Sequence, residues 1–211
     1  MRRRSTPIWL LPARKRFAPD LMPLRVISGT AGGLHLKSPK RHALRPTQDR
    51  IRQVVFSSLA EIVPGARVLD LYAGTGSFGI EALSRGAAAA TFVEQDKEAV
   101  QCIRDNLVHC HLQGDVRQGD ALAYLDKPPA EPFDLIFADP PYTKARGTLD
   151  EDPLLTRLLP FIAENGVFVW EHYAEQRLDF AGSWEVIRQR DYGETGLTFL
   201  RYSHKNKKIT L

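Results

Sequence analysis

Three acidic residues stand where an apolar run of the sequence gives way to a loop. Asp70 lies at the end of a run of strand-forming residues, Glu94 closes the next apolar run, and Asp139 closes a third. Short apolar runs without a helical period predict buried strands. In an open α/β sheet, ligands bind beyond the carboxyl ends of the strands. We therefore expect the three carboxylates to face one ligand-binding crevice.

The loop after Asp70 carries Gly74, Gly76 and Gly79 in the spacing G-x-G-x-x-G. Glycine permits a sharp turn and a close approach of the backbone to a ligand. A helix expected over 77–86 would direct its unpaired N–H groups and the positive end of its dipole at that ligand. The spacing is the dinucleotide fingerprint, but by itself it is a weak signal. An NAD-linked oxidoreductase therefore stays an alternative at this point.

Asp70 and Glu94 favour S-adenosylmethionine over a dinucleotide. A dinucleotide sets an anionic pyrophosphate against this loop and helix end, where the Asp70 carboxylate would repel it. S-adenosylmethionine has no phosphate, and Asp70 can bind its ammonium group directly or through a water molecule. Glu94 lies 18 residues beyond Gly76, about where an acidic residue binds a ribose diol. Both cofactors need that diol contact, so Glu94 supports a nucleotide site without choosing between them.

Asp139, Pro140, Pro141 and Tyr142 follow the apolar run 133–137. The two prolines fix φ and lack an N–H, which makes the loop stiff and leaves carbonyl acceptors exposed. This combination suits a planar amine such as the exocyclic NH₂ of a nucleobase, because Asp139 and the Pro140 carbonyl would accept its two N–H bonds while Tyr142 stacks on the ring. We therefore expect these four residues to hold such an amine beside the crevice.

The composition is that of a soluble globular protein, with 43% hydrophobic and 26% charged residues among 211. No apolar run approaches the roughly 20 residues of a membrane span, and Ile8–Leu11 is too short for a signal peptide. We therefore expect a cytoplasmic protein. Cys102 and Cys110 imply neither a disulfide framework nor a zinc site. No metal is expected at His109-Cys110-His111 either, because adjacent residues on a helix point in different directions.

The charge is unevenly distributed along the chain. Residues 1–61 contain 13 Lys and Arg against 3 Asp and Glu, a net of +10, and the remainder contains 16 against 22, a net of −6. Such asymmetry suggests that the N-terminal part faces a polyanion. Residues 1–24 are rich in Pro and Arg without periodicity, and we expect them to be disordered. Charge alone also permits a non-catalytic RNA-binding protein.

Strand and helix patterns alternate along most of the chain, which predicts a parallel sheet with helices on both faces. A small hairpin is expected over 24–37, and Thr47 is expected to cap a helix that follows. Near the end, the runs 184–188 and 197–201 predict an antiparallel hairpin. The other expected strands are 67–72, 90–94, 115–117, 133–137 and 166–170, and the other expected helices are 77–86, 97–111 with Asp96 as its cap, and 152–163.

Asp139–Tyr142 resembles motif IV of the amino methyltransferases, and Leu69–Gly76 resembles their cofactor motif I. Together with four further segments, the chain is similar to the RsmD family, bacterial enzymes that methylate guanine N2 in small-subunit (16S) ribosomal RNA. Those segments are 25–29, 44–50, 79–85 and 196–202, so the resemblance covers residues 24–202. Ser28 stands where a glycine is common, and the extension before Met22 is not a family feature.

The resemblance implies an α/β fold of the class I methyltransferase, Rossmann-like kind. The sheet would be mostly parallel with a C-terminal antiparallel hairpin and helices on both faces, preceded by a small N-terminal hairpin and helix. The chain would divide into a disordered basic extension (1–23), an RNA-facing segment (24–63), the methyltransferase domain (64–203) and a basic tail (204–211).

The resemblance further implies S-adenosylmethionine as methyl donor and S-adenosylhomocysteine as product. The substrate would be 16S rRNA, either free or within the assembling small subunit. We expect the protein to be a monomer. A DNA adenine-N6 or cytosine-N4 methyltransferase stays the runner-up, because the same acceptor geometry serves any exocyclic amine. The residues implied for the cofactor are Asp70, Tyr72, Gly74, Thr75, Gly76, Glu94, Gln95, Asp120, Ala121 and Asp139. Those implied for catalysis are Asp139, Pro140, Pro141 and Tyr142, and those for RNA are Arg25, Arg45, Thr47, Arg50, Arg52 and Tyr142.

Overall fold

The computed structural model describes residues 24–39, 46–141, 153–174 and 184–202. Arg45, Tyr142, the basic extension 1–23 and the tail 204–211 lie outside these described residues. The backbone of Thr47 is described but its side chain is not. Expectations that fall on these residues stay predictions.

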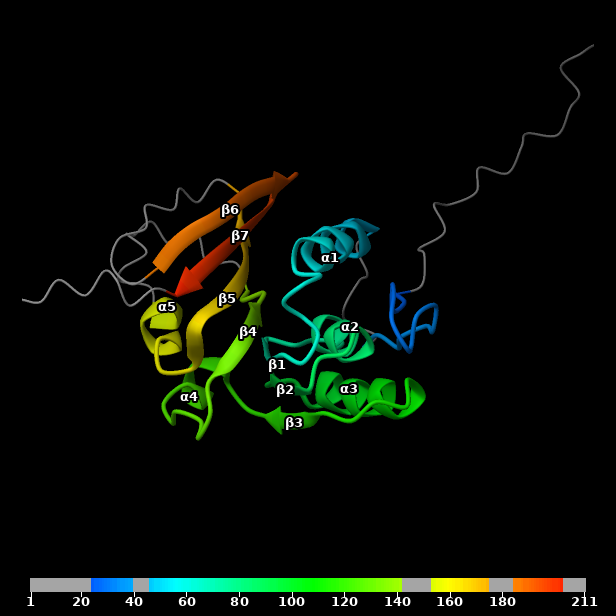
Figure 1. The fold of residues 1–211 in the computed structure, drawn as a ribbon. Helices are drawn as coiled ribbons and strands as arrows, with labels where there is room; N and C mark the ends of the chain where they lie inside the picture. Colours follow the sequence, from blue (N-terminus) through cyan, green and yellow to red (C-terminus); the bar gives the residue numbers. More distant parts are fainter. Residues whose placement is uncertain (1–23, 40–45, 142–152, 175–183, 203–211) are drawn as a thin grey trace, which may run out of the picture.

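Seven strands form one sheet in the order β3-β2-β1-β4-β5-β7-β6 (Figure 1). The first five strands are parallel, and β7 pairs antiparallel with both β5 and β6. The expected mostly parallel sheet with a C-terminal antiparallel hairpin is therefore confirmed. The strands are β1 (Arg67–Leu71), β2 (Ala89–Glu94), β3 (Asp115–Gln118), β4 (Phe133–Ala138), β5 (Ile162–Tyr173), β6 (Trp184–Tyr192) and β7 (Thr195–Tyr202).

Alternate residues of the central strands point to opposite faces of the sheet, and each face has its own hydrophobic core. Val68 of β1 packs with α1 (Pro46–Ser58), α2 (Ser77–Ser84) and α3 (Lys97–His109), whereas Leu69 packs with α4 (Ala121–Tyr124) and α5 (Pro153–Leu158). Figure 1 shows these two helical layers on either side of the strands. Because both faces are covered, the central strands are apolar along nearly their whole length.

The order of strands reverses between β1 and β4, since β2 continues from β1 in one direction while β4 and β5 continue in the other. This is the topological switch point at which open α/β sheets bind their ligands. The loops that leave β1 and β4 carry the glycine-rich segment and the Asp-Pro-Pro segment. The two motifs that the sequence singled out therefore lie side by side.

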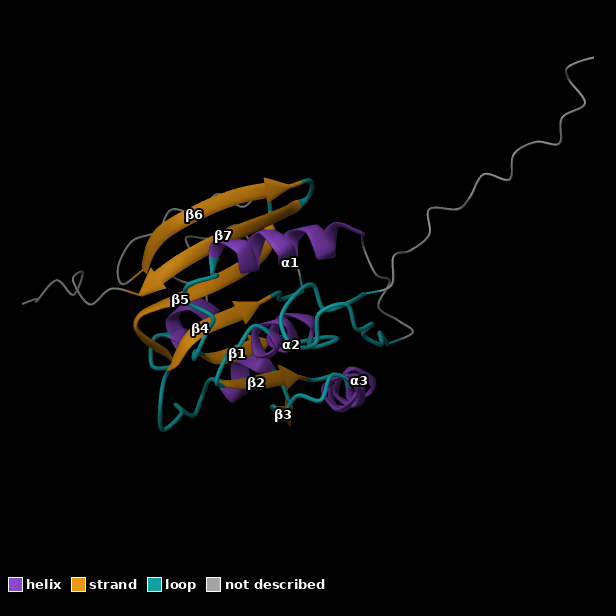
Figure 2. Cartoon of the chain, turned by 45° about the vertical axis from the view of Figure 1, so that its right-hand side comes forward, coloured by secondary structure: helices purple, strands orange, loops and turns teal. Residues whose placement is uncertain are grey.

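The N-terminal hairpin has a single bridge, Arg25 to His35, supported by backbone hydrogen bonds such as Val26 N to Leu34 O at 2.9 Å. Its apolar residues and those of α1 share one core cluster with β1, β4, β5 and β7. Figure 2 shows α1 lying along β7, and Arg188 of β6 donates a hydrogen bond to the Ser58 hydroxyl at the end of α1, at 2.9 Å. The N-terminal segment is thus packed onto the sheet.

Asn106 of α3 connects the N-terminal segment to the glycine-rich loop. Its side chain is fully buried, and its amide oxygen accepts from the backbone N–H of Lys37 at 2.8 Å. Its amide nitrogen lies 3.0 Å from the carbonyl oxygen of Lys37 and 3.1 Å from that of Thr75. One side chain therefore fixes the position of two segments that are distant in sequence.

Two local expectations were wrong. Thr47 lies inside α1, which begins at Pro46, so Thr47 is not the N-cap. The helix expected over 152–163 ends at Leu158, because Ile162 already pairs with Phe133 and begins β5. The single-turn helix α4, whose N-cap is Asp120, has no counterpart among the expected elements. By contrast, the Asp96 carboxylate accepts from the Ala99 N–H at 2.8 Å, which confirms that cap.

Within the described residues, no helix combines the length and the apolar character needed to cross a bilayer.

Candidate active site

A cavity of about 330 Å³ lies at the switch point between β1 and β4. Residues 70–75 and 77–78 form one side of it, Glu94 and Gln95 follow from β2, and residues 137–139 and 141 follow from β4. Val169 and Glu171 of β5 and Leu197 of β7 complete the lining. The cavity therefore extends across four neighbouring strands and into the C-terminal hairpin.

The glycine-rich loop owes its shape to backbone conformations that favour glycine. Gly74 and Gly76 have φ of 54° and 76°, in the left-handed region, so a side chain at either position would be strained. A Cβ at Gly79 would lie 2.3 Å from the Phe92 ring, so glycine here lets α2 pack closely on β2. The three positions of the G-x-G-x-x-G spacing thus set a turn and a close helix contact.

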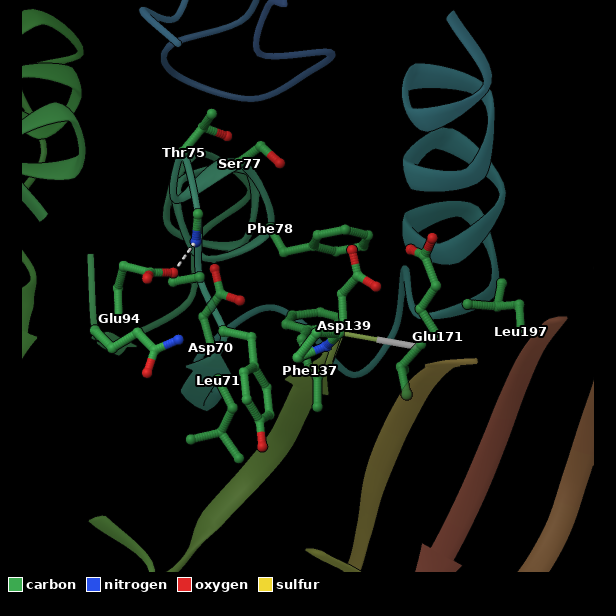
Figure 3. A pocket seen from close by; sticks show the side chains of 17 residues that line it. Asp70, Leu71, Thr75, Ser77, Phe78, Glu94, Phe137, Asp139, Glu171 and Leu197 are labelled. Atoms are coloured by element: carbon green, nitrogen blue, oxygen red, sulfur yellow. Dashed lines mark hydrogen bonds between the residues drawn. The ribbon is translucent and has the colours of Figure 1, made fainter. Parts of the chain in front are cut away.

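The Glu94 carboxylate organises this loop. One oxygen accepts from the Gly74 N–H at 2.8 Å (Figure 3). The other accepts from the Asp96 N–H, also at 2.8 Å. The carboxylate lines the cavity and is partly exposed. Each carboxylate oxygen has a second lone pair, so Glu94 can hold the loop and still accept from a ligand hydroxyl.

Asp70 is almost completely enclosed, with 4% of its surface exposed. One oxygen accepts from the Gly79 N–H in the first turn of α2, at 2.9 Å. Burial raises the pKa of Asp70 to about 8, the Gly79 hydrogen bond opposes this, and the nearby Glu94 and Asp139 carboxylates add to it. A cationic ligand in the cavity would favour the ionised form of this carboxyl group.

Asp139 lies at the end of β4 and is partly exposed to the cavity. Glu171 of β5 lies on the adjacent strand: Ala138 pairs with Trp170 in the parallel register, and Asp139 and Glu171 directly follow these two residues in the chain. Glu171 is 8% exposed and lines the same cavity. Figure 3 shows both side chains pointing in the same direction from their strands.

The remaining wall is apolar and largely aromatic. The rings of Phe78 and Phe137 lie 5.0 Å apart between centroids, and Val169 and Leu197 extend this surface over β5 and β7. Four carboxylates, those of Asp70, Glu94, Asp139 and Glu171, also line the cavity, and the described lining residues include no Lys, Arg or His. Such a site suits a cationic ligand that carries flat apolar groups, and its carboxylates would repel an anionic pyrophosphate.

The structure brings most of the expected cofactor residues to this cavity: Asp70, Tyr72, Gly74, Thr75, Glu94, Gln95 and Asp139. Gly76 does not line the cavity but packs against α3, because a Cβ at this position would lie 3.1 Å from the Ile103 side chain. Asp120 and Ala121 do not line the cavity. The Asp120 carboxylate instead accepts from the Ala123 N–H and caps α4.

The expected catalytic residues are only partly described. Asp139 and Pro141 line the cavity, and Pro140 lies between them without lining it. Glu171 was missed by the sequence analysis although its signal is the same as that of Asp139, an acid directly after the apolar run 166–170. The apolar wall gave no such signal, because buried residues of a strand look alike in sequence whether or not they reach a cavity.

Arg52 was expected to contact RNA, and this was wrong. Its side chain is 1% exposed, and its guanidinium binds Asp49 at 2.9 Å and the Arg25 carbonyl oxygen. Burial lowers the pKa of Arg52, which the Asp49 and Glu81 carboxylates oppose. A side chain enclosed in this way cannot reach a phosphate. Arg25 and Arg50 are exposed, so their expected role stays open.

No group of three or more His, Cys, Asp or Glu side chains in the described part of the chain has an arrangement that could hold a metal ion.

A family model, curated relatives and solved structures each match most of the chain. The model of the family described as "Conserved hypothetical protein 95" matches residues 24–201. The Bacillus subtilis protein YlbH is 35% identical over 185 residues, which cover 84% of this chain and 98% of that protein. The Escherichia coli (strain K12) protein named "Ribosomal RNA small subunit methyltransferase D" is 33% identical over 174 residues, covering 81% of this chain and 86% of that protein. The solved structure of Escherichia coli yhhF gives a TM-score of 0.74 at 30% identity and covers 85% of this chain and 98% of that chain.

Proposed function

The chain belongs to the RsmD family, whose model is described as "Conserved hypothetical protein 95", and we propose that it methylates the exocyclic N2 amine of a guanine in small-subunit ribosomal RNA. It is an rRNA methyltransferase, and S-adenosylmethionine is its cofactor. The guanine-N2 specificity and the roles of single residues are the proposal. The observation that carries it is the meeting of the glycine-rich loop and the Asp-Pro-Pro segment at one cavity lined by carboxylates.

The cavity fits S-adenosylmethionine in charge and in size. Asp70 and Glu94 supply carboxylates beside the loop, where the cofactor's ammonium and ribose hydroxyl groups need acceptors. The Phe78 and Phe137 rings supply apolar surface, and the cavity of about 330 Å³ lies within the range of small-molecule sites. An NAD-linked oxidoreductase is disfavoured, because a pyrophosphate would face four carboxylates.

The bound cofactor supplies an electrophilic methyl group on a sulfonium centre. The amine of a nucleobase is a weak nucleophile, because its lone pair is delocalised into the ring. Asp139 and the Pro140 carbonyl would accept the two N–H bonds and hold them out of the ring plane, so that the lone pair becomes available. As the carbon–nitrogen bond forms and the carbon–sulfur bond breaks, the Asp139 carboxylate stabilises the positive charge on the amine. The amine then loses one proton, to Asp139 or to water.

Positioning supplies most of the acceleration in such an in-line displacement. The stiffness of the Pro140-Pro141 backbone keeps the acceptors in place. A nucleobase in a duplex must leave its stack to reach an enclosed cavity. Basic residues of the N-terminal segment would bind phosphates and give affinity without sequence choice.

The test is tritiated methyl transfer to undermethylated small subunits, to naked 16S rRNA and to DNA, followed by nucleoside analysis. We expect N2-methylguanosine from one or both RNA substrates. Label in N6-methyladenosine or N4-methylcytosine from DNA would instead support the runner-up and contradict the proposal. Comparison of the two RNA substrates decides whether the acceptor is free rRNA or the assembled particle.

A further inference from the structure

Glu171 stands beside the expected amine site without a role in the chemistry described above. It is the neighbour of Asp139 on the next strand, and adjacent strands lie roughly 4.8 Å apart. Its side chain is 8% exposed, and the exposed part faces the cavity.

The atom next to the amine distinguishes guanine from the other amino-bearing nucleobases. In guanine the ring nitrogen N1 beside the N2 amine carries a hydrogen and is a donor. In adenine and cytosine the ring nitrogen beside the amine, N1 or N3, has a lone pair and is an acceptor. An ionised carboxylate is an acceptor only, so a carboxylate at this place binds guanine and repels the other two.

We propose that Glu171 reads the target base by accepting a hydrogen bond from guanine N1–H while Asp139 holds the N2 amine. This inference rests on the proposed function, and it assigns the selection of guanine to a residue outside the Asp-Pro-Pro-Tyr segment. Leu197, which pairs with Glu171 across β5 and β7, and the ring of Phe78 supply apolar surface beside the two acids. The Asp-Pro-Pro-Tyr acceptors can bind any exocyclic amine, whereas the Glu171 carboxylate would bind only a base with a donor beside the amine, which is guanine.

The test uses 2-aminopurine, which keeps the amine at position 2 but has an unprotonated N1. The guanine that the wild-type protein methylates is first located by nuclease digestion and mass spectrometry. Small-subunit RNA is then ligated around a synthetic segment that carries guanine or 2-aminopurine at that position, and tritiated methyl transfer is measured on the RNA or the reconstituted particle. For the wild-type protein we expect kcat/KM to be lower with 2-aminopurine by about 10²-fold or more, since a site built around a donor leaves its acceptor unpaired with the analogue.

Glu171→Gln keeps an acceptor oxygen for guanine N1–H but loses the negative charge, and its NH₂ can donate to the 2-aminopurine N1. We expect the ratio of kcat/KM on guanine to kcat/KM on 2-aminopurine to fall by about tenfold or more in this variant, while it binds S-adenosylmethionine as the wild-type protein does. A purely structural role would lower activity on both bases equally. The matched control is Glu185→Gln, an exposed acid on β6 outside the cavity, which should retain the wild-type preference.

Equal turnover of guanine and 2-aminopurine by the wild-type protein would overturn the role of Glu171, and this result needs no variant to fold. An unchanged preference in a folded Glu171→Gln protein would overturn it as well. In both cases the appearance of N2-methylguanosine would leave the proposed function intact. Methylation of adenine or cytosine would overturn both.

Discussion

Arg52 and Glu81 face each other in the interior, with Nε of Arg52 4.0 Å from Oε2 of Glu81 and both side chains at most 1% exposed. Glu81 also accepts from the Ile27 and Ser28 N–H groups, at 2.6 and 3.1 Å, and from Nε of Arg85 at 2.6 Å. The cluster therefore joins the hairpin, α1 and α2. Two arginines that differ by two positions in sequence, Arg50 and Arg52, thus have different roles.

Reversal of Arg52 to Glu should destabilise the protein. Loss of one partner from a buried ion pair costs about 3–5 kcal/mol, and the new carboxylate would face Glu81 and Asp49. Arg50→Glu, on the exposed side of the same helix, should leave the free energy of unfolding nearly unchanged. Urea denaturation of the two variants measures the difference. Equal stability of both would contradict the buried cluster.

Arg50→Glu should act on RNA binding instead. We expect RNA affinity to fall and the slope of log K against log salt to flatten by about 0.7–0.9 if one phosphate contact is lost. S-adenosylmethionine binding should stay at the wild-type value. A truncation of residues 1–21 gives the comparison: if it abolished RNA binding while Arg50→Glu changed neither affinity nor slope, the RNA surface would belong to the extension.

Asp139→Ala should retain S-adenosylmethionine binding and lose methyl transfer by about 10²-fold or more, because it removes a group that stabilises developing charge. Asp139→Asn keeps an acceptor oxygen but not the negative charge, so its activity should lie between that of the wild-type protein and that of Asp139→Ala. Asp126→Ala, an exposed acid outside the cavity, is the control. Single-turnover kinetics measures methyl transfer, and calorimetry measures S-adenosylmethionine binding. Wild-type turnover by Asp139→Ala would exclude it from amine activation.

Glu94→Ala should weaken cofactor binding first. Each hydrogen bond to a charged group contributes about 1.5–3 kcal/mol, and the change also leaves the Gly74 N–H at 2.8 Å without its acceptor. We expect the Kd for S-adenosylmethionine to rise by about 10-fold or more, since 1.4 kcal/mol corresponds to tenfold. Glu61→Ala, an exposed acid away from the cavity, should bind as the wild-type protein does. An unchanged Kd for Glu94→Ala would remove this residue from the site.

The sequence predicted the sheet and the position of the site well, because these follow from strong local signals. Asp70 and Asp139 end apolar runs, and the rule that ligands bind beyond strand ends placed both at one cavity. Strand order and register depend on pairing between distant segments, which a single sequence does not show. Glu171 was missed for this reason, since its importance comes from lying beside Asp139 in the β4–β5 register.

The side of a helix on which a charged residue lies was the weaker part of the prediction. Arg52 was expected at the surface because arginine is mostly exposed. Its burial became evident only from the structure, where Glu81 of α2 and the Arg25 carbonyl oxygen lie against it. The expected role of Asp120 toward the cofactor stays a prediction, because a capping acid and a ligand-binding acid after a strand look alike in sequence.

Asp70 should make the stability of the folded protein depend on pH. Its pKa in the folded protein is about 8, above the ordinary value of 3.8. Between these values the folded protein holds a proton that the unfolded chain has released. The contribution of Asp70 to the free energy of unfolding should therefore be greatest below this interval and should fall as the pH rises through it, by at most about 1.4 kcal/mol per pH unit for one proton. Asp70→Asn should lose this dependence, and thermal or urea unfolding at several pH values measures it.

Cofactor binding should show the opposite trend. The ammonium and sulfonium charges of S-adenosylmethionine favour ionised Asp70, so binding should lower its pKa and release a proton near pH 7. Affinity relative to Asp70→Asn should then rise between about pH 6 and 8, while the cofactor's own amine titrates equally with both proteins. Calorimetry in two buffers of different ionisation enthalpy counts the released proton. If both proteins released the same number of protons, cofactor binding would not change the protonation of Asp70, and its carboxylate would not be the group that titrates.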